Sequence, residues 1–400
     1  MLMRFSSAAA RAALLAGLCS AARAQTLAPA ALSTGTEARL RAARPGDVVA
    51  VPDFAFDSLP VLPLNVSPND GRALLLSDAP EYFRTGDGVS LQETLAPGAY
   101  RLYLYHVARP WDAVKTITAI LENTGAKPVR LTVTRSVFPD PSTDYFSLAK
   151  TVLKGWLDPP GASRTALVPP RGWAPLEPRM DHLGTSSDAL VHGVFEFEID
   201  QPARLSVLQK KPNQDSGAAA SSLPKLPMVL PGQHESGAGR GLFRTGDLDV
   251  SDGPIYDSAQ GPAQVIVADG ASDPWIVGRD GITGTDGVAD KGNYGTLYNF
   301  RVRYRTSASA SGSRLGVALL FTSRRTKDSS CNVAAGVVRA EGETVVLPSQ
   351  AATIDGEPDT VLIRRYAPVA DGATGVITLT YSPPGASCLP TPLLLVPYRP

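Results

Sequence analysis

The stretch Tyr100–Ser136 reads YRLYLYHVARPWDAVKTITAILENTGAKPVRLTVTRS and carries the longest alternation of side-chain character in the chain. An alternation with a period of two residues places successive side chains on opposite faces of a β-strand. In its last part, Val129, Leu131 and Val133 are separated by arginine and threonine, as in a sheet with one wet face. The stretch therefore predicts three antiparallel strands, with a turn at 123–125 between the last two.

The length and the composition extend this prediction to the whole chain. The 400 residues exceed what one hydrophobic core usually organises, so two domains are expected. The 36 glycines and 35 prolines suit short strands joined by loops. We predict an all-β fold of two β-sandwich or jelly-roll-like domains. The predicted divisions are a lead-in at 25–45, a first domain at 46–209, a linker at 210–227 and a second domain at 228–400.

One segment changes its period from 2 to 3.6 residues and predicts a helix at about 143–157 in the first domain. Tyr145, Leu148, Val152 and Trp156 then share one face, and Ser142 or Thr143 can cap the helix start. We expect this helix to pack across a sheet, with Trp156 in the core.

Residues 1–24 have the pattern of an export signal. Basic residues open the segment, an apolar stretch follows, and Ala22-Arg23-Ala24 forms a small-x-small cleavage site. The apolar stretch is far shorter than the roughly 20 residues that a membrane span needs. We therefore expect cleavage after Ala24, a periplasmic or extracellular location, and no transmembrane segment in the mature chain.

Loss of this segment leaves 35 basic against 38 acidic side chains, so nucleic acid is not an expected partner. It also leaves two cysteines, Cys331 and Cys388. An even count in an oxidising compartment predicts a disulfide, which could stabilise the fold by about 4 kcal/mol. Two free buried thiols are the alternative.

No local signature of a nucleophile, a zinc protease or a phosphate-binding loop is present in the sequence. The catalytic candidates are Asp181 and His182, as an acid–base pair in a loop, and Asp280. His106 lies in phase with the apolar residues of its strand, which indicates a hydrogen-bonded structural histidine. Glu196 belongs to a row of carboxylates along one strand face, which is usually solvated.

Two acidic, glycine-rich loops in the second half suggest calcium, the only cofactor that the sequence indicates. Calcium needs six to eight oxygen ligands on a tightly turning backbone. Turns that use aspartate and glycine only for their backbone conformation are the alternative. The candidate ligands are Asp247, Asp249, Asp252, Asp280, Asp286 and Asp290.

Aromatic side chains flank the second of these loops, and another aromatic set, Trp111 with Tyr103 and Tyr105, lies in the first domain. Either set could stack on sugar rings. The candidate ligand-binding residues are Trp275, Tyr294, Tyr298 and Trp111. Ordinary sandwich cores use the same residue types, so a structural role is the alternative.

Four segments carry a resemblance to known proteins: LENTGAKPVRLTVTR (121–135), PDPSTDYFSLAKTVLKGWL (139–157), GRGLF (239–243) and GNYGTLY (292–298). They resemble segments of secreted bacterial β-sandwich proteins of unknown function, some of which carry copper-amine-oxidase-type N-terminal stalk domains. The resemblance covers most of 70–305 and implies export and an all-β build. It implies no activity and no functional residue.

Two classes of function remain. The first is an exported, non-catalytic binding or cell-envelope-associated protein for polysaccharide, because rigid sandwiches with aromatic loops suit sugar binding. The second is a secreted carbohydrate-active hydrolase or lyase, because catalysis by two carboxylates leaves no contiguous motif. Whether the protein is an enzyme stays open at this point. Paired acids at the floor of a cleft favour the second class, and a flat aromatic strip favours the first.

Overall fold

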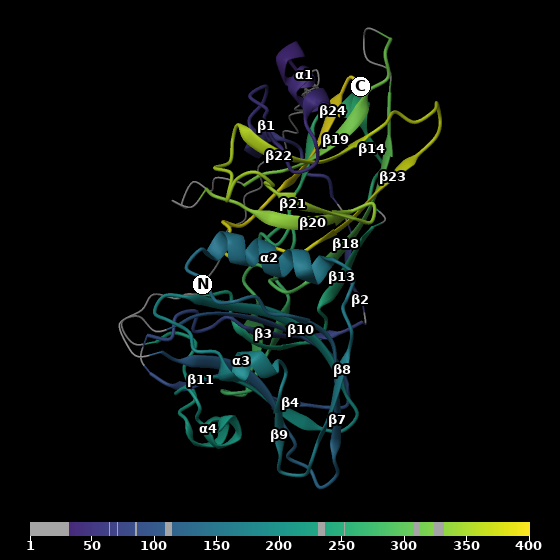
Figure 1. Cartoon of the computed structure of the whole chain (residues 1–400). Helices are drawn as coiled ribbons and strands as arrows, with labels where there is room; N and C mark the ends of the chain where they lie inside the picture. Colours follow the sequence, from purple (N-terminus) through teal and green to yellow (C-terminus); the bar gives the residue numbers. More distant parts are fainter. Residues whose placement is uncertain are drawn as a thin grey trace, which may run out of the picture.

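The computed structural model describes residues 32–63, 65–69, 71–84, 86–108, 114–230, 237–251, 253–307, 312–323 and 332–400. Of the described residues, 44% lie in strands and 12% in helices, which confirms the predicted all-β class. The strands form four sheets that pair into two sandwiches (Figure 1).

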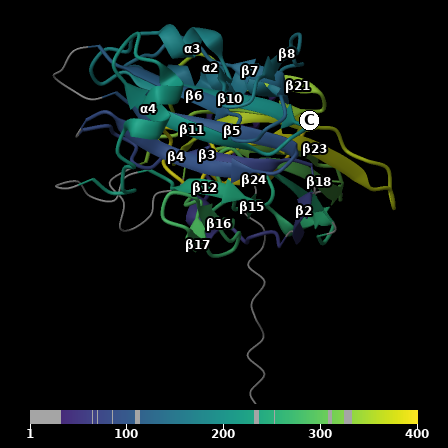
Figure 2. The ribbon, with the colours of Figure 1, turned by 90° about the horizontal axis from the view of Figure 1, so that it is seen from below.

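The first sandwich packs an eight-stranded sheet on a four-stranded sheet. The eight-stranded sheet has the order β17 (Thr285–Ala289), β16 (Val277–Asp280), β12 (Arg240–Phe243), β3 (Ala73–Ser77), β5 (Gly98–Val107), β10 (Leu190–Ile199), β7 (Val129–Val137) and β8 (Arg164–Val168). The four-stranded sheet has the order β4 (Gly88–Leu95), β11 (Ala203–Lys210), β6 (Thr116–Glu122) and β9 (Trp173–Pro175). Figure 2 shows the succession from β10 through β5, β3 and β12 to β16 and β17.

The second sandwich packs a five-stranded sheet on a seven-stranded sheet. The five-stranded sheet has the order β1 (Val48–Ala50), β22 (Asp359–Tyr366), β19 (Gly316–Phe321), β24 (Leu393–Tyr398) and β15 (Ala263–Val265). The seven-stranded sheet has the order β2 (Asn65–Asn69), β13 (Asp247–Ser251), β18 (Leu297–Arg305), β23 (Gly375–Tyr381), β20 (Gly336–Ala340) and β21 (Glu343–Leu347), with β14 (Tyr256–Asp257) also paired to β18.

Helix α2 (Tyr145–Leu157) lies between the two sandwiches (Figure 1). Its face with Val152 and Trp156 packs against Tyr105 and Val194 of the eight-stranded sheet and against Val337 of β20. The predicted helix and its buried face are therefore confirmed. The cap differs, because the side chain of Asp144 accepts the hydrogen bond from the backbone N–H of Ser147 at 3.1 Å.

The other helices cover the outer faces of the sandwiches. Helix α1 (Thr34–Ala42) packs on the five-stranded sheet, and α4 (Ser216–Ser222) packs on the four-stranded sheet. The short α3 (Pro178–His182) contacts β6, and two 3-10 turns lie at Phe56–Ser58 and Ser258–Gln260. None of the helices in the described ranges is long and apolar enough to cross a membrane.

The three strands predicted in Tyr100–Ser136 exist, but they do not pair with one another. β5 and β7 flank β10 in the eight-stranded sheet, whereas β6 lies across the core in the four-stranded sheet. The wet face predicted at 129–134 is found in β7, where Val129 and Leu131 are buried and Arg130 is exposed, but β5 of the same sheet differs. Its outer face, with Tyr103 and Tyr105, is buried because α2 and the second sandwich cover it.

The sheets also cross the predicted domain boundaries. β1 and β2 stand in the first half of the sequence but belong to the second sandwich. β12, β16 and β17 stand in the second half but extend the first sandwich, because β12 pairs with the free edge of β3. The predicted linker 210–227 contains α4, whose Ala219 and Ala220 are fully buried. Strand alternation specifies which face is buried and does not specify the neighbour, so the sequence could not show this exchange.

Candidate functional site

A cavity of about 270 Å³ lies where the two sandwiches meet, and we call it the junction cavity. Its walls come from the end of β3, from β5, and from the segments that precede β12, β18 and β24. The lining residues are Asp78, Glu81, Tyr103, Tyr105, Gly237, Ala238, Lys291, Tyr294, Gly385, Ala386 and Ser387. The site is therefore assembled from five segments that are distant in the sequence.

Asp78 anchors one wall of the junction cavity. Its Oδ2 accepts a hydrogen bond from the backbone N–H of Ala238 at 2.6 Å, and Glu81 accepts one from the backbone of Gly237. Gly237 has φ +84°, and a Cβ there would stand 1.8 Å from the carbonyl oxygen of Asp78, so only glycine allows this close approach. The second oxygen, Asp78 Oδ1, is buried and has no hydrogen-bond partner.

Two further buried polar atoms near the cavity also have no hydrogen-bond partner. One is the hydroxyl of Tyr103, a side chain that lines the cavity and is 1% exposed. A Cβ on Gly385 would lie 2.8 Å from that hydroxyl, so the missing side chain leaves room in front of it. The other is Oδ2 of the fully buried Asp290, whose Oδ1 accepts the backbone N–H of Tyr294 at 3.0 Å.

The carboxyl groups at this site bind protons more tightly than usual. Burial, followed by the charges of Glu81 and Asp290, raises the pKa of Asp78 well above its ordinary value. Burial likewise raises the pKa of Asp290 well above its ordinary value and raises the pKa of Glu81. Groups whose pKa is shifted by burial together with a specific neighbour are candidates for function when they line a cleft.

Aromatic rings form the rest of the wall. The ring centroids of Tyr103 and Tyr294 lie 6.2 Å apart, and the edge of His192 packs on Tyr103 at 4.9 Å and on Tyr105 at 5.2 Å. Burial lowers the pKa of His192 to about 4, so this imidazole is neutral at neutral pH. Its Nδ1 donates to the carbonyl of Leu104 at 2.7 Å, which fixes the ring.

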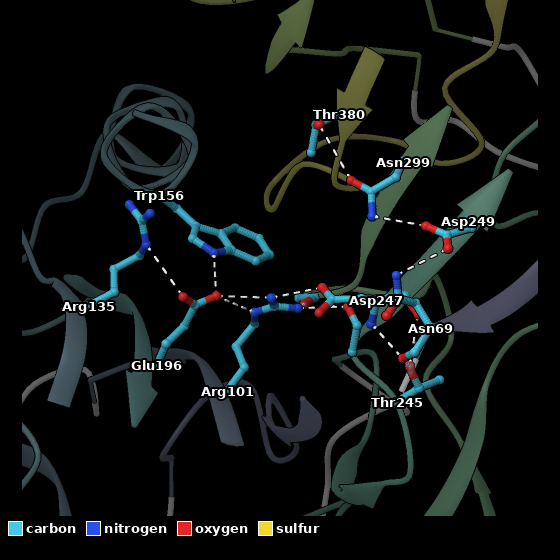
Figure 3. Close-up of polar contacts among 12 residues, drawn as sticks. Asn69, Arg101, Arg135, Trp156, Glu196, Thr245, Asp247, Asp249, Asn299 and Thr380 are labelled. Atoms are coloured by element: carbon cyan, nitrogen blue, oxygen red, sulfur yellow. Dashed lines mark hydrogen bonds and ion pairs between the residues drawn. The ribbon is translucent and has the colours of Figure 1, made fainter. Parts of the chain in front are cut away.

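A second cluster of buried charged side chains lies near the junction cavity (Figure 3). In contrast to the cavity, almost every polar group of this cluster has a partner. Arg101 of β5 is 1% exposed and donates to Glu196 at 2.9 Å and to Asp247 at 2.8 Å. Its guanidinium also lies 4.7 Å from the ring centroid of Trp156, and the indole N–H of Trp156 donates to Glu196 at 3.2 Å. Arg135 adds an ion pair to Glu196 at 3.5 Å. We call these residues the Arg101 cluster.

Hydrogen bonds continue from the Arg101 cluster into the second sandwich. Thr245 donates to the carbonyl of Asn69 at 2.8 Å, and Asn69 donates to Asp249 at 3.1 Å. Asn299 reaches the other oxygen of Asp249 at 3.4 Å (Figure 3). The cluster therefore joins β5 and β10 of the first sandwich to β2, β13 and β18 of the second.

The pKa of the carboxyl group of Glu196 in the Arg101 cluster is shifted in the opposite direction from the pKa values of Asp78 and Glu81 at the junction cavity. Burial alone would raise the pKa of Glu196, but the charges of Arg101 and Arg72 and the hydrogen bonds from Arg101 and Trp156 outweigh it and lower the pKa. Glu196 is thus held as a paired carboxylate. The expectation of a solvated carboxylate is wrong at this position, because α2 covers the strand face on which Glu196 lies.

Among the described residues that line two other cavities, none has a buried polar atom without a partner. One of about 500 Å³ lies beside Trp173, but its Glu122 and Arg204 form a two-bonded pair at 2.7 and 2.9 Å. The other, of about 300 Å³, opens at the edge of the second sandwich and is lined mainly by apolar side chains such as Val250 and Phe300. The junction cavity therefore offers the strongest chemistry among the described residues.

The structure gives the predicted catalytic residues structural partners. Asp181 is buried, accepts the hydroxyl of Ser216 at 2.5 Å and lies 3.7 Å from the ammonium of Lys210. His182 is exposed at the end of α3, so the two do not form the expected acid–base pair. Asp280 is fully buried, and Arg240 donates to its two carboxylate oxygens at 2.9 and 3.1 Å. Burial alone would raise the pKa of Asp280, but the hydrogen bonds and charge of Arg240 and the hydrogen bond from Thr283 outweigh burial and lower it. His106 is the predicted hydrogen-bonded histidine, with Ser77 at 2.8 Å and the carbonyl of Pro80 at 2.9 Å.

The predicted calcium ligands are dispersed. Asp247 pairs with Arg101, Asp280 pairs with Arg240, and Asp286 is exposed beside Arg279. Asp249 accepts from two asparagines, and Asp290 stands behind the junction cavity. Within the described ranges, no group of three or more histidine, cysteine, aspartate or glutamate side chains is arranged to hold a metal ion.

The predicted aromatic platform is not assembled by the residues that the structure describes. Tyr298 is 1% exposed, and its hydroxyl donates to Asp273 at 2.7 Å. Trp275 is 37% exposed, and its indole N–H donates to the carbonyl of Ala268 at 3.0 Å. Only Tyr294 of the predicted set lines the junction cavity. Trp111, Asp252, Cys331 and the segment 1–24 lie outside the described residues.

Sequence reasoning missed Asp78 and Glu81. In the sequence, Asp78 follows an apolar strand and precedes Ala79-Pro80, which is the ordinary pattern of a turn. The one usable signal is Tyr103 and Tyr105, which alternate with leucines and so fall together on one face of a strand.

Comparison with known proteins adds no family. No protein-family model and no curated protein matches the chain. A salicylate 1,2-dioxygenase from Pseudaminobacter salicylatoxidans is a weak structural neighbour, 11% identical, covering 75% of this chain and 71% of its own, with a TM-score of 0.11. A likeness at this level carries no argument, so the function has to be argued from the geometry of the chain itself.

Proposed function

We propose that the protein is an exported polysaccharide-binding protein that holds one sugar unit in the junction cavity. A single observation carries the proposal: Asp78 Oδ1 and Tyr103 Oη are buried and have no partner, and both residues line the same cavity. A buried polar atom without a partner costs about 1–3 kcal/mol, so a ligand that pairs with it recovers that free energy.

A sugar unit fits this site by size and by chemistry. The volume of about 270 Å³ lies just below the roughly 300–1,000 Å³ typical of drug-sized ligands, so one small unit suits it. Sugar hydroxyls both donate and accept hydrogen bonds, as the carboxyl groups and Tyr103 require. The ring of Tyr294, which is only partly buried and lines the cavity, supplies aromatic surface for the apolar side of a sugar ring.

One observation favours a second candidate, a carbohydrate-active hydrolase or lyase. Asp78 and Glu81 line the same cavity, and the charge of Glu81 helps to raise the pKa of Asp78. Neighbouring carboxyl groups that share protons in this way can act as acid and base. Binding remains the first proposal, because each of the two carboxyl groups already accepts a hydrogen bond from the backbone at 237–238.

Export and a disulfide belong to the same proposal. Their support is the signal pattern at 1–24 and the position of Cys388, which is 6% exposed. Its backbone N–H donates to the carbonyl of Val333 at 2.9 Å, and its Sγ accepts from Val333 at 3.2 Å, two residues along the chain from Cys331. Unfolded, non-reduced protein from an oxidising compartment should leave both thiols unlabelled by a maleimide reagent. Labelling of both would contradict the bridge.

The function can be tested with a panel of neutral, N-acetylated, amino and uronic acid polysaccharides, measuring both retention and the release of new chain ends. Asp78→Asn is the informative variant, because it keeps an oxygen for Ala238 and removes the spare carboxylate oxygen. Glu93→Gln is the matched control, because Glu93 is also buried and also accepts a backbone N–H, from Gly281 at 2.6 Å.

Each outcome separates the two candidates. Retention that Asp78→Asn loses and Glu93→Gln keeps would support binding in the junction cavity. Release of chain ends that Asp78→Asn or Glu81→Gln abolishes would make the protein a hydrolase or lyase instead. Neither retention nor release across the whole panel would overturn both.

A further inference from the structure

We propose that the sugar unit held in the junction cavity is an amino sugar whose protonated primary amine is bound by the carboxyl groups of Asp78 and Glu81 and by the hydroxyl of Tyr103. The inference rests on the proposed saccharide function and adds the chemical class of the unit.

The spare hydrogen-bonding capacity of the site matches an ammonium group. Asp78 Oδ1 and the hydroxyl oxygen of Tyr103 have no partner, and Glu81 adds a second carboxyl group at the same wall. A primary ammonium has three donors and no acceptor, so it can give one N–H to each carboxyl group and one to the hydroxyl oxygen of Tyr103. An N-acetyl group brings one N–H and a carbonyl oxygen, which would leave at least one of these oxygens unpaired.

The aromatic wall also favours a cation. Tyr103, Tyr105 and Tyr294 line the cavity and present ring surface close to the carboxyl groups. The negative face of an aromatic ring attracts a cation, and this attraction grows when water is excluded. Tyr103 and Tyr105 are 1% and 6% exposed, so the contact would be largely dry.

Among the described residues that line the cavity, the carboxyl groups of Asp78 and Glu81 outnumber the ammonium group of Lys291, and Arg84 acts on Glu81. The titratable and charged groups that face one another from the surrounding elements are Asp78, Glu81, Tyr82, Arg84, Tyr103, Tyr105, Tyr145, Asp188, His192, Asp290, Lys291, Tyr294 and Tyr381. A bound cation would offset the repulsion among the carboxylates.

Binding should be coupled to proton release. Without ligand, burial and then the charge of Glu81 raise the pKa of Asp78, so this carboxyl group binds a proton more tightly than a carboxylate in water does. An ammonium ligand favours the ionised carboxylate and expels that proton. A neutral sugar brings no positive charge, so it does not favour the ionised form of the carboxyl groups.

The experiment is isothermal titration of the purified protein with β-1,4-linked glucosamine oligomers, the matching N-acetylglucosamine oligomers, the matching glucose oligomers and methylamine. Each titration is repeated at neutral pH in two buffers of different ionisation enthalpy, which reveals protons released on binding. Asp78→Asn and Glu93→Gln serve as the test and control variants.

We expect the glucosamine oligomers to bind at least about tenfold more tightly than the N-acetylated and glucose oligomers, with proton release for the amine alone. Asp78→Asn should remove most of this preference, and Glu93→Gln should keep it. Equal affinity for all three oligomers, without proton release, would overturn the inference and leave the proposed function standing. Binding of methylamine alone, or of nothing, would overturn both.

Discussion

The Arg101 cluster and the junction cavity both bury charged groups between the same two sandwiches. They differ in whether the buried polar atoms have hydrogen-bond partners. Arg101 meets two carboxylates and the carbonyls of Gly246 and Gly295, at distances from 2.6 to 3.2 Å. At the cavity, Asp78 and Tyr103 each leave a buried atom without a partner. Both regions use residues of the eight-stranded sheet, so burial alone does not distinguish them. The pairing of Arg101 on one side and of Asp78 and Tyr103 on the other does.

The difference predicts opposite responses to substitution. Breaking a buried ion pair leaves an uncompensated charge, so each member of the Arg101 cluster should matter for stability. Groups that are kept for a ligand cost stability in its absence, so their loss should be neutral or favourable for folding. The predictions below run from the largest expected effect to the smallest.

Removal of Arg101 should have the largest effect. Arg101→Met leaves Glu196 and Asp247 buried without their shared cation and should cost about 3–5 kcal/mol of the free energy of unfolding. Urea denaturation at neutral pH measures this loss. Adding Glu196→Gln and Asp247→Asn to Arg101→Met should restore part of it. A loss below about 1 kcal/mol for Arg101→Met would mean that the cluster does not hold the sandwiches together.

Glu196→Gln should show a stability loss that depends on pH. The pKa of Glu196 is lowered in the folded protein, so its contribution is present above its ordinary value of 4.5 and disappears as pH falls through the lower folded value. We expect a loss of about 1–3 kcal/mol at pH 7 that shrinks progressively below about pH 4. Urea titrations of the unsubstituted protein and of Glu196→Gln between pH 7 and pH 3 test this. A difference in the free energy of unfolding that grows as the pH falls would contradict it.

Two buried tyrosines give a matched pair. The hydroxyl of Tyr256 donates to the carbonyl of Gly261 at 2.8 Å, so Tyr256→Phe should cost about 1 kcal/mol. The hydroxyl of Tyr103 has no partner, so Tyr103→Phe should cost nothing. Both side chains are 1% exposed, which makes burial equal. Equal losses for the two variants would show that Tyr103 has a partner in solution.

Much of the secondary structure could be predicted from the sequence, because periodicity reports which side chains share a face. The alternation in Tyr100–Ser136 correctly separates Leu102 and Leu104, which enter the core of the first sandwich, from Tyr103 and Tyr105 on the other face. The change of period near residue 143 correctly marks α2. These are local properties of the backbone, and they do not depend on distant partners.

The pairing of strands and the site could not be predicted, because they depend on contacts between distant segments. Arg101 and Asp247 are 146 residues apart in the sequence, and Asp78 and Ala238 are 160 apart. From the sequence alone, Arg101 in its strand would be expected to face solvent. Its burial follows only from α2 and the second sandwich, which cover that face of the sheet. Asp280 shows the opposite case. The sequence suggested it as a functional carboxylate, but in the structure it forms an ion pair with Arg240 of a neighbouring strand.

The most direct test of the contrast is the free energy of unfolding of Asp78→Asn relative to the unsubstituted protein, by urea denaturation at pH 7.5 without ligand. Burial raises the pKa of Asp78, so asparagine replaces either a neutral acid or a costly buried charge, and it keeps an acceptor for Ala238. We predict that Asp78→Asn is as stable as the unsubstituted protein or more stable. A loss of more than about 1 kcal/mol would show that Asp78 is a structural partner like Glu196 and would contradict the assignment of the junction cavity as a ligand site.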